Sequence, residues 1–344
     1  MTAAPPGPAA DCAALVNRVL KNARHLARWA RREDLEAYRV YDRDIPEFPY
    51  AVDRYGAWLC VQLFEGKRPL AEQEVVAHLD ALGAALEVER ARVALKVRRR
   101  QRGAAQYEKL TADGPSFTVR ERGHLFEVNL LRYLDTGLFL DHRETRALVA
   151  SEARERRVLN LFAYTGSFTV YVAKAGAAAS VTVDMSHTYQ AWTARNLALN
   201  GLTDDARHRL VTADVNTWLE EQAWRRERFD LIVLDDLSYV RKDQAETSVL
   251  FELISARYER RSIMITANQP FSGWDSIFLD KAMTVAAIDR LVHHATILEM
   301  NVESYRRRSA LASATSLRDS APDPATSPSD IETMPATSLR DNAS

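Results

Sequence analysis

The chain has 344 residues, of which 47% are hydrophobic, and its 46 basic and 47 acidic residues leave a net charge of −1. This length and apolar content are enough to bury at least one full core and to form two domains. Because the basic and acidic residues nearly balance, the net charge does not indicate a polyanionic partner such as a nucleic acid. Any basic surface must therefore be local.

Two cysteines, Cys12 and Cys60, are too few and too far apart in sequence for a disulfide framework or a zinc site. They fit a reducing cytoplasm, where we expect the protein. Residues 1–10 lack the charged start and apolar run of a signal peptide, and no stretch approaches the ~20 apolar residues that cross a bilayer. We therefore expect neither a signal nor a membrane anchor, and a flexible N-terminus over residues 1–10.

The first part of the chain predicts a small α+β accessory domain over residues 11–115. Apolar residues recur at helical spacing over residues 11–33, and basic residues follow another stripe of the same helix. Alternating or aromatic-rich segments then indicate strands, interrupted by one further helix. The strands are expected at residues 38–41, 50–52, 57–63 and 93–97, and the helix at residues 71–86.

A run of basic residues ends this domain. Its members are Lys96, Arg98, Arg99, Arg100 and Arg102. Such a density of positive charge could neutralise several phosphates of a nucleic-acid backbone. The alternative is a charged turn that is simply solvated, and the run alone does not decide between the two.

From about residue 116 short apolar strands alternate with helices. The strands are expected at residues 158–161, 180–184, 209–213, 230–234 and 262–266, with helices after Gly166 and over residues 186–200. This alternation predicts a parallel, doubly wound α/β sheet that binds ligands beyond the carboxyl ends of its strands. Residues 309–344 are rich in Ala, Ser, Thr, Pro and Asp and contain no aromatic residue, so we expect a disordered tail.

The ends of the first three strands carry residues suited to a nucleoside. Gly166 follows the first strand and lets the backbone approach a ligand at the start of a helix. Asp184 ends the second strand, where a carboxylate can accept both ribose hydroxyls, and Asp214 ends the third, near the expected adenine ring. The alternative is that both carboxylates only cap the helices or turns that follow them.

Five stretches of the chain resemble the methyltransferases that form 7-methylguanosine in large-subunit ribosomal RNA, the RlmKL type. They are KVRRRQRG (96–103), YEKL (107–110), YLDTGLFLDHR (133–143), LNLFAYTG (159–166) and TVDMS (182–186), and the resemblance covers residues 11–234. It implies a class I methyltransferase fold over residues 116–234 that uses S-adenosyl-L-methionine (SAM), behind an accessory domain that binds ribosomal RNA. The implied SAM contacts are Asp141, Arg143, Asn160, Phe162, Tyr164, Thr165, Gly166, Asp184, Met185 and Asp214.

The fourth strand, residues 229–236, departs from that family, and we call this strand the seam. Methyltransferases of this type follow it with an acidic residue, two prolines and an aromatic residue, a rigid turn under the target base. Here the turn is Asp235-Asp236-Leu237-Ser238-Tyr239, without the two fixed φ angles of the prolines. Asp235 and Tyr239 are the remaining candidates for contact with the base, since any aromatic face can stack.

From the seam onward the chain resembles the C-terminal half of the IstB-like helper ATPases of insertion sequences. The matching stretches are LIVLDDLSYV (231–240), TSVLFELI (247–254), YERR (258–261), ITANQPF (265–271) and AIDRLVHH (287–294). The resemblance implies that Asp235 and Asp236 form a Walker B element, that Asn268 senses the γ-phosphate and that Arg290 is an arginine finger. The sequence has no Gly-x-x-x-x-Gly-Lys-[Ser/Thr] loop to cradle phosphates, which argues against ATP and magnesium binding.

Three functions follow from these two resemblances. The first is a SAM-dependent ribosomal RNA methyltransferase, active or impaired by the replaced turn after the fourth strand. The second is a fragment of a transposition helper ATPase, with DNA or a transposase as partner, and the third is an inactive chimera. In each case we expect residues 235–308 to complete the sheet, with the strand at 262–266 in fifth place and a later strand at 295–300, and we expect no metal site.

Overall fold

The computed structural model describes residues 12–65, 68–98, 114–204, 206–221, 228–237, 244–278 and 280–298. The predicted flexible N-terminus and disordered tail lie outside these residues. Residues up to 300 form one compact unit, and within the described residues no helix combines the length and apolarity needed to span a membrane.

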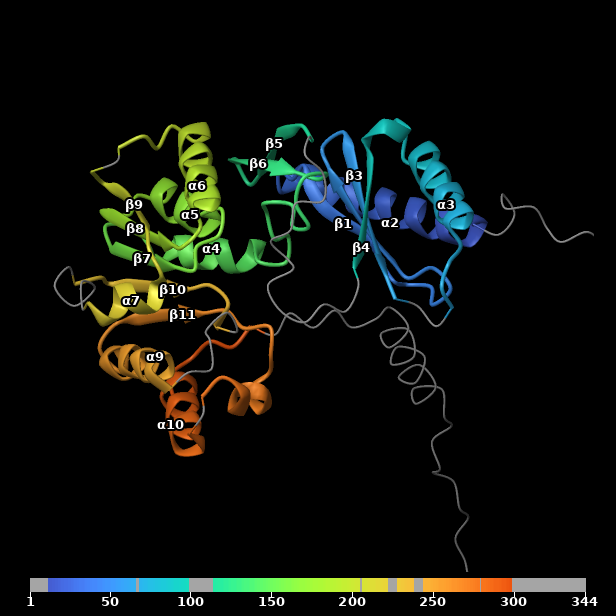
Figure 1. Cartoon of the computed structure of the whole chain (residues 1–344). Coiled ribbons are helices and arrows are strands. Elements are labelled where there is room, and N and C mark those ends of the chain that lie inside the picture. Colours follow the sequence, from blue (N-terminus) through green and yellow to red (C-terminus); the bar gives the residue numbers. More distant parts are fainter. Residues whose placement is uncertain are drawn as a thin grey trace, which may run out of the picture. The chain divides into compact units, whose positions relative to one another are not determined.

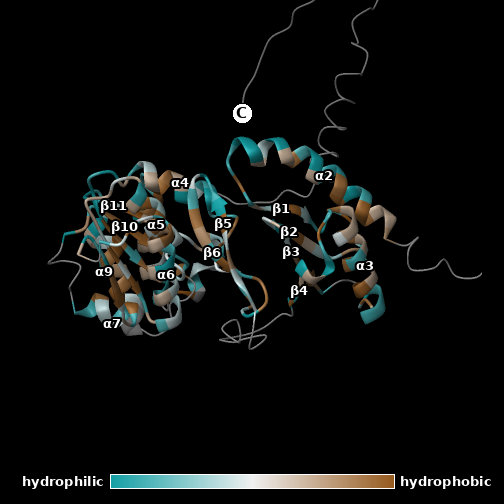
Figure 2. Cartoon of the chain, turned by 90° about the horizontal axis from the view of Figure 1, so that it is seen from above, coloured by the Kyte–Doolittle hydropathy of each residue, from teal (hydrophilic) through white to brown (hydrophobic). Residues whose placement is uncertain are grey.

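A four-stranded sheet with two helices forms the first part of the chain, as predicted (Figure 1). Its elements are α2 (Ala13–Arg32), β1 (Ala37–Asp42), β2 (Tyr50–Tyr55), β3 (Trp58–Phe64), α3 (Glu72–Ala85), a 3-10 turn η1 (Arg90–Arg92) and β4 (Val93–Arg98). The strands lie in the order β1-β2-β3-β4, and only the β3–β4 pair is parallel. Apolar and polar residues alternate along α2 (Figure 2), and its buried Leu15 and Val19 join the core that α2 and α3 form on the sheet.

The hairpin β5 (Ser116–Glu121) and β6 (His124–Asn129) connects this sheet to the second one. Its two turn residues, Arg122 and Gly123, both have positive φ, which matches the right-handed twist of the strands. The buried side chains of the hairpin lie in one core with Tyr55 of β2 and Tyr171 of the helix α5 (Ser167–Lys174). The two sheets are therefore linked by buried apolar contact as well as by the chain.

The second sheet has five parallel strands in the order β11-β10-β7-β8-β9. Its elements are α4 (Arg143–Ser151), β7 (Arg157–Leu161), α5 (Ser167–Lys174), β8 (Ala179–Asp184), α6 (His187–Leu199), β9 (His208–Thr212), α7 (Val215–Glu220), β10 (Leu231–Leu234), α9 (Gln244–Arg257), β11 (Ser262–Ile265), a 3-10 segment η4 (Phe271–Ser276) and α10 (Lys281–Val292). The predicted doubly wound sheet is confirmed, with β11 in fifth place. The later strand expected at residues 295–300 is wrong over residues 295–298, which are exposed and irregular, and its last two residues lie outside the described part.

One hydrophobic core crosses the seam. It contains Leu161 and Val183 from the strands before the seam, Ile232 and Leu234 of β10, and a set of side chains after it. The latter are Leu237, Leu250, Leu253, Ile254, Trp274, Ile277, Phe278 and Ala287. The segment after the seam is thus packed into the same sheet, because its apolar side chains cover strands that precede it.

A buried arginine links the starts of the neighbouring strands β10 and β11. The Arg257 guanidinium, at the end of α9, donates to the carbonyls of Phe229 at 2.6 Å, Asp230 at 2.7 Å and Ser262 at 2.5 Å. Burial, together with the nearby Arg261, lowers the pKa of Arg257 to about 10. A side chain of the downstream segment therefore caps the starts of both β10 and β11.

Candidate active site at the carboxyl edge of the five-stranded sheet

The carboxyl ends of β7, β8 and β9 lie at one edge of the sheet. Leu161 pairs with Val183, and Asp184 pairs with Thr212. Beyond these pairs the connecting loops are also hydrogen-bonded, because the Ala163 N–H donates to the carbonyl of Val183 at 3.3 Å. The three strand ends that the sequence singled out are therefore brought together.

Asp184 joins two of these loops through its carboxylate. One oxygen accepts the N–H of Tyr164 at 2.9 Å, and the other accepts the N–H of Ser186 at 2.8 Å. Burial raises the pKa of Asp184, and the two backbone hydrogen bonds oppose that increase. Each oxygen keeps a second lone pair that can accept a ligand hydroxyl.

The loop after β7 has an unusual backbone. Phe162, Tyr164 and Gly166 have φ of 55°, 51° and 70°, in the left-handed region that non-glycine residues seldom adopt. A Cβ on Gly166 would lie 2.3 Å from Cγ2 of Thr193 on α6, so only glycine fits this close approach of loop and helix. Such strain persists only where neighbouring groups hold the loop in place.

The segment before α4 holds this loop from the other side. The Gly137 N–H donates to the Tyr164 hydroxyl at 3.0 Å, and the Thr165 hydroxyl donates to the Gly137 carbonyl at 2.7 Å. The rings of Phe139 and Tyr164 lie 5.2 Å apart. Gly137 itself has φ of 93° and lies against Trp192, where a Cβ would meet the indole at 2.3 Å. The loop is therefore fixed between the segment that contains Gly137 and α6.

The other predicted SAM residues at this edge differ in exposure. Met185 follows Asp184 and is 67% exposed, a large fraction for an apolar side chain that would flank a ligand. Asp214 is exposed and caps α7, since its Oδ1 accepts the N–H and the hydroxyl of Thr217. Asn160 is buried and donates to the Thr169 hydroxyl at 3.0 Å, while its Oδ1 is buried without a partner among the described residues. Helix capping thus accounts for one contact of Asp214, and the bond from the Ser186 N–H caps the turn after Asp184; the bond from the Tyr164 N–H links Asp184 to a second loop as well.

The structure corrects two predicted contacts in which a basic side chain is buried. Arg143 was expected at SAM, but its guanidinium donates to Glu121 at 3.0 Å and to the carbonyl of Ala37 at 2.6 Å. Lys96 was expected at RNA, but it is 1% exposed and its ammonium donates to the carbonyls of Tyr133 at 2.7 Å and Leu134 at 2.9 Å. Both side chains have structural partners instead.

The remaining predicted SAM and RNA residues differ: one is exposed, one is partly exposed and hydrogen-bonded, and three lie outside the described residues. Asp141 is exposed at the start of α4. Arg98 is partly exposed and pairs with Asp135 at 3.2 Å and with Gln62 at 2.9 Å. Arg99, Arg100 and Arg102 lie outside the described residues.

The turn after the seam is held by hydrogen bonds in place of prolines. The Asp236 N–H donates to the Thr266 hydroxyl at 2.5 Å, that hydroxyl donates to the Asp235 carboxylate at 2.8 Å, and the Leu237 N–H donates to the Thr266 carbonyl at 2.9 Å. Asp236 has φ of 63°. Tyr239, the predicted stacking residue, lies outside the described part of the chain.

Sequence reasoning missed His142 as a neighbour of Asp235. Burial raises the pKa of the Asp235 carboxyl, and His142 and the Thr266 hydroxyl oppose that increase. His142 Nδ1 is buried without a hydrogen-bond partner among the described residues. No local pattern marks this pair, because 93 positions separate the two residues in the sequence.

The residues that the ATPase resemblance singled out differ in exposure and contacts. Asn268 is exposed. The Arg290 guanidinium lies over the ring of Phe251 at 5.2 Å and donates to the Ala286 carbonyl of its own helix at 2.8 Å, so it is engaged within the chain and does not extend toward a neighbour. Asp235 and Asp236 share Thr266 as described above.

Comparison with known proteins gives two families. The family model for the IstB-like ATP binding protein matches residues 200–313. The ribosomal RNA large subunit methyltransferase K of Neisseria meningitidis serogroup B is 47% identical over 236 residues, which are 67% of this chain and 66% of that protein. The methyltransferase K/L of Methylococcus capsulatus is 48% identical over 235 residues, 66% of this chain and 32% of that protein. The chain thus spans just under two thirds of the first relative and about one third of the second.

Solved structures share the fold. A putative SAM-dependent methyltransferase from Streptococcus mutans has a TM-score of 0.58 at 21% identity, covering 84% of this chain and 73% of its own. A putative methyltransferase complexed with S-adenosylhomocysteine (SAH) has a TM-score of 0.57 at 20% identity, covering 84% and 75%. The fold is that of the class I SAM-dependent methyltransferases. Over about two thirds of its length the chain is similar to the ribosomal RNA large subunit methyltransferases K and K/L, and it continues into a segment similar to the IstB-like ATP binding proteins.

Proposed function

We propose that this chain binds SAM at the carboxyl edge of β7, β8 and β9 and methylates a guanosine of large-subunit ribosomal RNA. The observation that carries the proposal is Asp184, a buried carboxylate held by two loop amides at the point where these strand ends converge. The relatives named above are ribosomal RNA methyltransferases, which supports this choice of substrate.

The residues at this edge fit an adenosine. Asp184 can accept the two ribose hydroxyls with its remaining lone pairs. The loop that ends at Gly166 leads directly into α5, so it presents backbone at the start of a helix beside Asp184, and the close packing of Gly166 on Thr193 keeps it there. Exposed Met185 provides an apolar surface beside Asp184 for the adenine ring, and we assign Asp214 to the rim of the same pocket.

The chemistry asks little of the side chains. Bound SAM supplies an electrophilic methyl group. A guanine ring nitrogen already carries a lone pair, so the chain needs no general base and acts by alignment of the two reactants. The fixed loop between Gly137 and α6 provides that alignment, since its position is set by hydrogen bonds from both sides.

The target base is assigned to the turn after the seam. We infer that Asp235 contacts the base, and that Thr266 gives the turn the rigidity that two prolines supply in the family. Four hydrogen bonds support this inference: the three around Thr266 and the one from the Asp235 N–H to the carbonyl of Leu161 at 3.1 Å. Arg98 and the undescribed arginines of the same run are proposed to contact the RNA backbone.

Calorimetry with SAM tests the cofactor site through the variant Asp184→Asn. Asparagine keeps one acceptor oxygen for the loop amides but loses the charge that strengthens a bond to a ribose hydroxyl, so we expect SAM to bind ~10- to 100-fold more weakly. Asp236→Asn is the matched control, because it makes the same change at a carboxylate outside the pocket and asparagine tolerates positive φ. Equal affinities for the two variants would remove Asp184 from the site.

A methyl-transfer assay on large-subunit ribosomal RNA tests the reaction itself. Transfer by the unmodified chain, with its rate lowered in Asp184→Asn, would support the full proposal. SAM binding without transfer would reject the target-base assignment at the seam and leave a SAM-binding protein. A parallel titration with Mg-ATP checks the IstB-like alternative, for which the engaged Arg290 and the missing phosphate loop predict no binding.

A further inference from the structure

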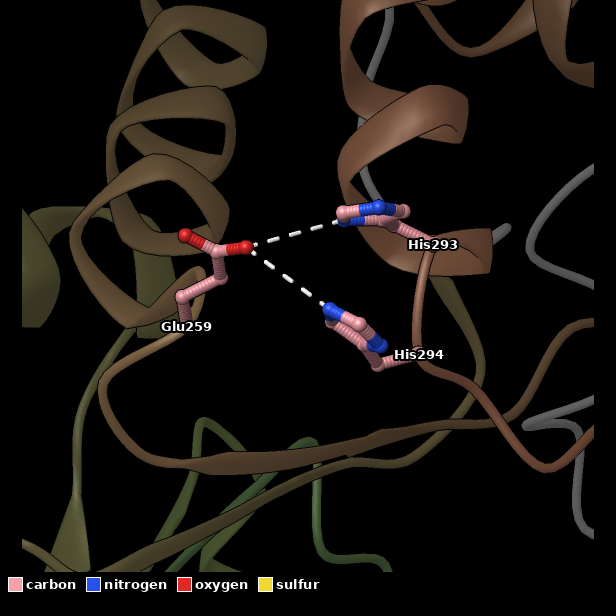
Figure 3. Close-up of side chains that lie close together, drawn as sticks. All are labelled: Glu259, His293 and His294. Carbon is pink, nitrogen blue, oxygen red and sulfur yellow. Dashed lines mark ion pairs between the residues drawn. The ribbon is translucent and has the colours of Figure 1, made fainter.

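A glutamate and two histidines meet on the surface of the downstream segment. Glu259 follows α9, and His293 and His294 end α10, so the three side chains come from two neighbouring helices (Figure 3). Glu259 has φ of 54°, an orientation that glutamate seldom adopts and that turns its side chain toward α10. The cluster lies outside every residue assigned to SAM or RNA.

The distances suit a small cation. One Glu259 oxygen lies 3.7 Å from Nδ1 of His293 and 3.7 Å from Nε2 of His294, and all three ligand atoms lie within 4.8 Å of one another. Two ligand atoms ~2.0–2.1 Å from a tetrahedral zinc ion are ~3.4 Å apart. Each Glu259–histidine separation therefore needs to close by ~0.3 Å, and the two histidine nitrogens, which lie within 4.8 Å of each other, by at most ~1.4 Å.

The surroundings keep the cluster assembled and open. The two imidazole rings lie 4.1 Å apart. The Tyr258 hydroxyl lies 2.7 Å from Nδ1 of His293 and also hydrogen-bonds with Glu259, so it keeps a partner when that nitrogen binds an ion. The side chains of Glu259, His293 and His294 are 54%, 52% and 71% exposed, which leaves solvent access for a further ligand.

We propose that Glu259, His293 and His294 bind a divalent transition-metal ion of the zinc class, with water completing a tetrahedral shell. Two neutral imidazoles and one carboxylate are a donor set that zinc accepts, and their charge of −1 favours a dication. Magnesium prefers an octahedral shell of oxygens and should not compete. Because the ligands come from both helices, the ion would fasten the end of α9 to the end of α10.

Titration of the tag-free, chelator-treated full chain tests this site. Zn²⁺ is followed by calorimetry, and Co²⁺ by the visible absorption bands of a tetrahedral complex. The variant is His294→Ala, which removes a ligand that is mostly exposed and leaves the contact of Tyr258 with His293 intact. The matched control is His25→Ala, an exposed histidine on α2. We expect His294→Ala to weaken Zn²⁺ binding at least ~10-fold and His25→Ala to leave it unchanged.

The unfolding midpoint temperature, measured with and without Zn²⁺, is a second test of the same variants. Zn²⁺ should raise the unfolding midpoint of the unmodified chain and of His25→Ala, and this increase should disappear in His294→Ala. Glu259→Gln should reproduce the loss, because it removes the anionic ligand with little change in shape. No Zn²⁺ binding by the unmodified chain, equal binding by His294→Ala and His25→Ala, or competition by Mg²⁺ at equal concentration would each overturn the proposal.

Discussion

At the scale of single residues, Glu121 fastens the β5–β6 hairpin to the helices α4 and α5. Its carboxylate accepts hydrogen bonds from Arg143 at 3.0 Å, Arg146 at 2.7 Å and the Tyr171 hydroxyl at 2.9 Å. Burial raises the pKa of Glu121, but Arg146 and Arg143 outweigh it and the pKa ends below its ordinary value. A carboxyl with a depressed folded pKa contributes stability above its unfolded pKa, and this stability is lost as the pH falls through the folded pKa.

Glu121→Gln tests that residue. The substitution leaves two buried guanidinium groups without their anion, and we expect it to lower the free energy of unfolding by about 3–5 kcal/mol. Tyr171→Phe removes one hydrogen bond from the same carboxylate and should lower it by only about 1 kcal/mol. Urea unfolding at neutral pH measures both values. Similar losses in the two variants would mean that the ion pairs contribute little beyond a hydrogen bond.

At the scale of elements, Arg257 joins α9 to the starts of β10 and β11. Arg257→Met keeps the apolar stem but leaves three carbonyls without this donor, and we expect a loss of about 3 kcal/mol in the free energy of unfolding. Arg261→Met is the matched control, because Arg261 forms a half-exposed pair with Asp230 and should contribute less than about 1 kcal/mol. The same denaturation curves report both variants, and equal losses would contradict a clamp at Arg257.

The elements themselves could be predicted from the sequence, whereas several side-chain partners could not. The strands of the second sheet are buried apolar runs between polar loops, so their type followed from the pattern, whereas the place of the fifth strand followed from the resemblance to methyltransferases. The convergence of Asp184 with the loop before Gly166 followed from the same topology. The partners of Arg143 and Lys96 were not predicted, because they lie far away in the sequence: Arg143 contacts residues 22 and 106 positions away, and Lys96 contacts residues 37 and 38 positions away. Local sequence gives no sign of such distant pairs.

At the scale of the whole molecule, the core across the seam predicts cooperative unfolding. Leu161 and Val183 share one core with Leu253 and Phe278, so the downstream segment cannot leave without exposing the strands of the proposed SAM site. We expect a single calorimetric unfolding transition whose midpoint temperature SAM raises. The free energy of unfolding should increase by about 2.7 kcal/mol at a SAM concentration 100 times its Kd. Hydrogen exchange should show protection rising in α9 as well as in α5. An earlier, SAM-independent transition for α9 and α10 would contradict this coupling.

Both ends of β10 are held by polar side chains of the segment that follows it in the sequence. At the start of β10 the Arg257 guanidinium donates to backbone carbonyls. At its end the Thr266 hydroxyl accepts the N–H of Asp236 and donates to the Asp235 carboxylate. Both side chains belong to the segment that follows the seam. In this chain a basic group therefore satisfies the carbonyls at the start of the β10–β11 pair, a hydroxyl holds the turn at its end, and the helix α9 lies between these two groups in the sequence.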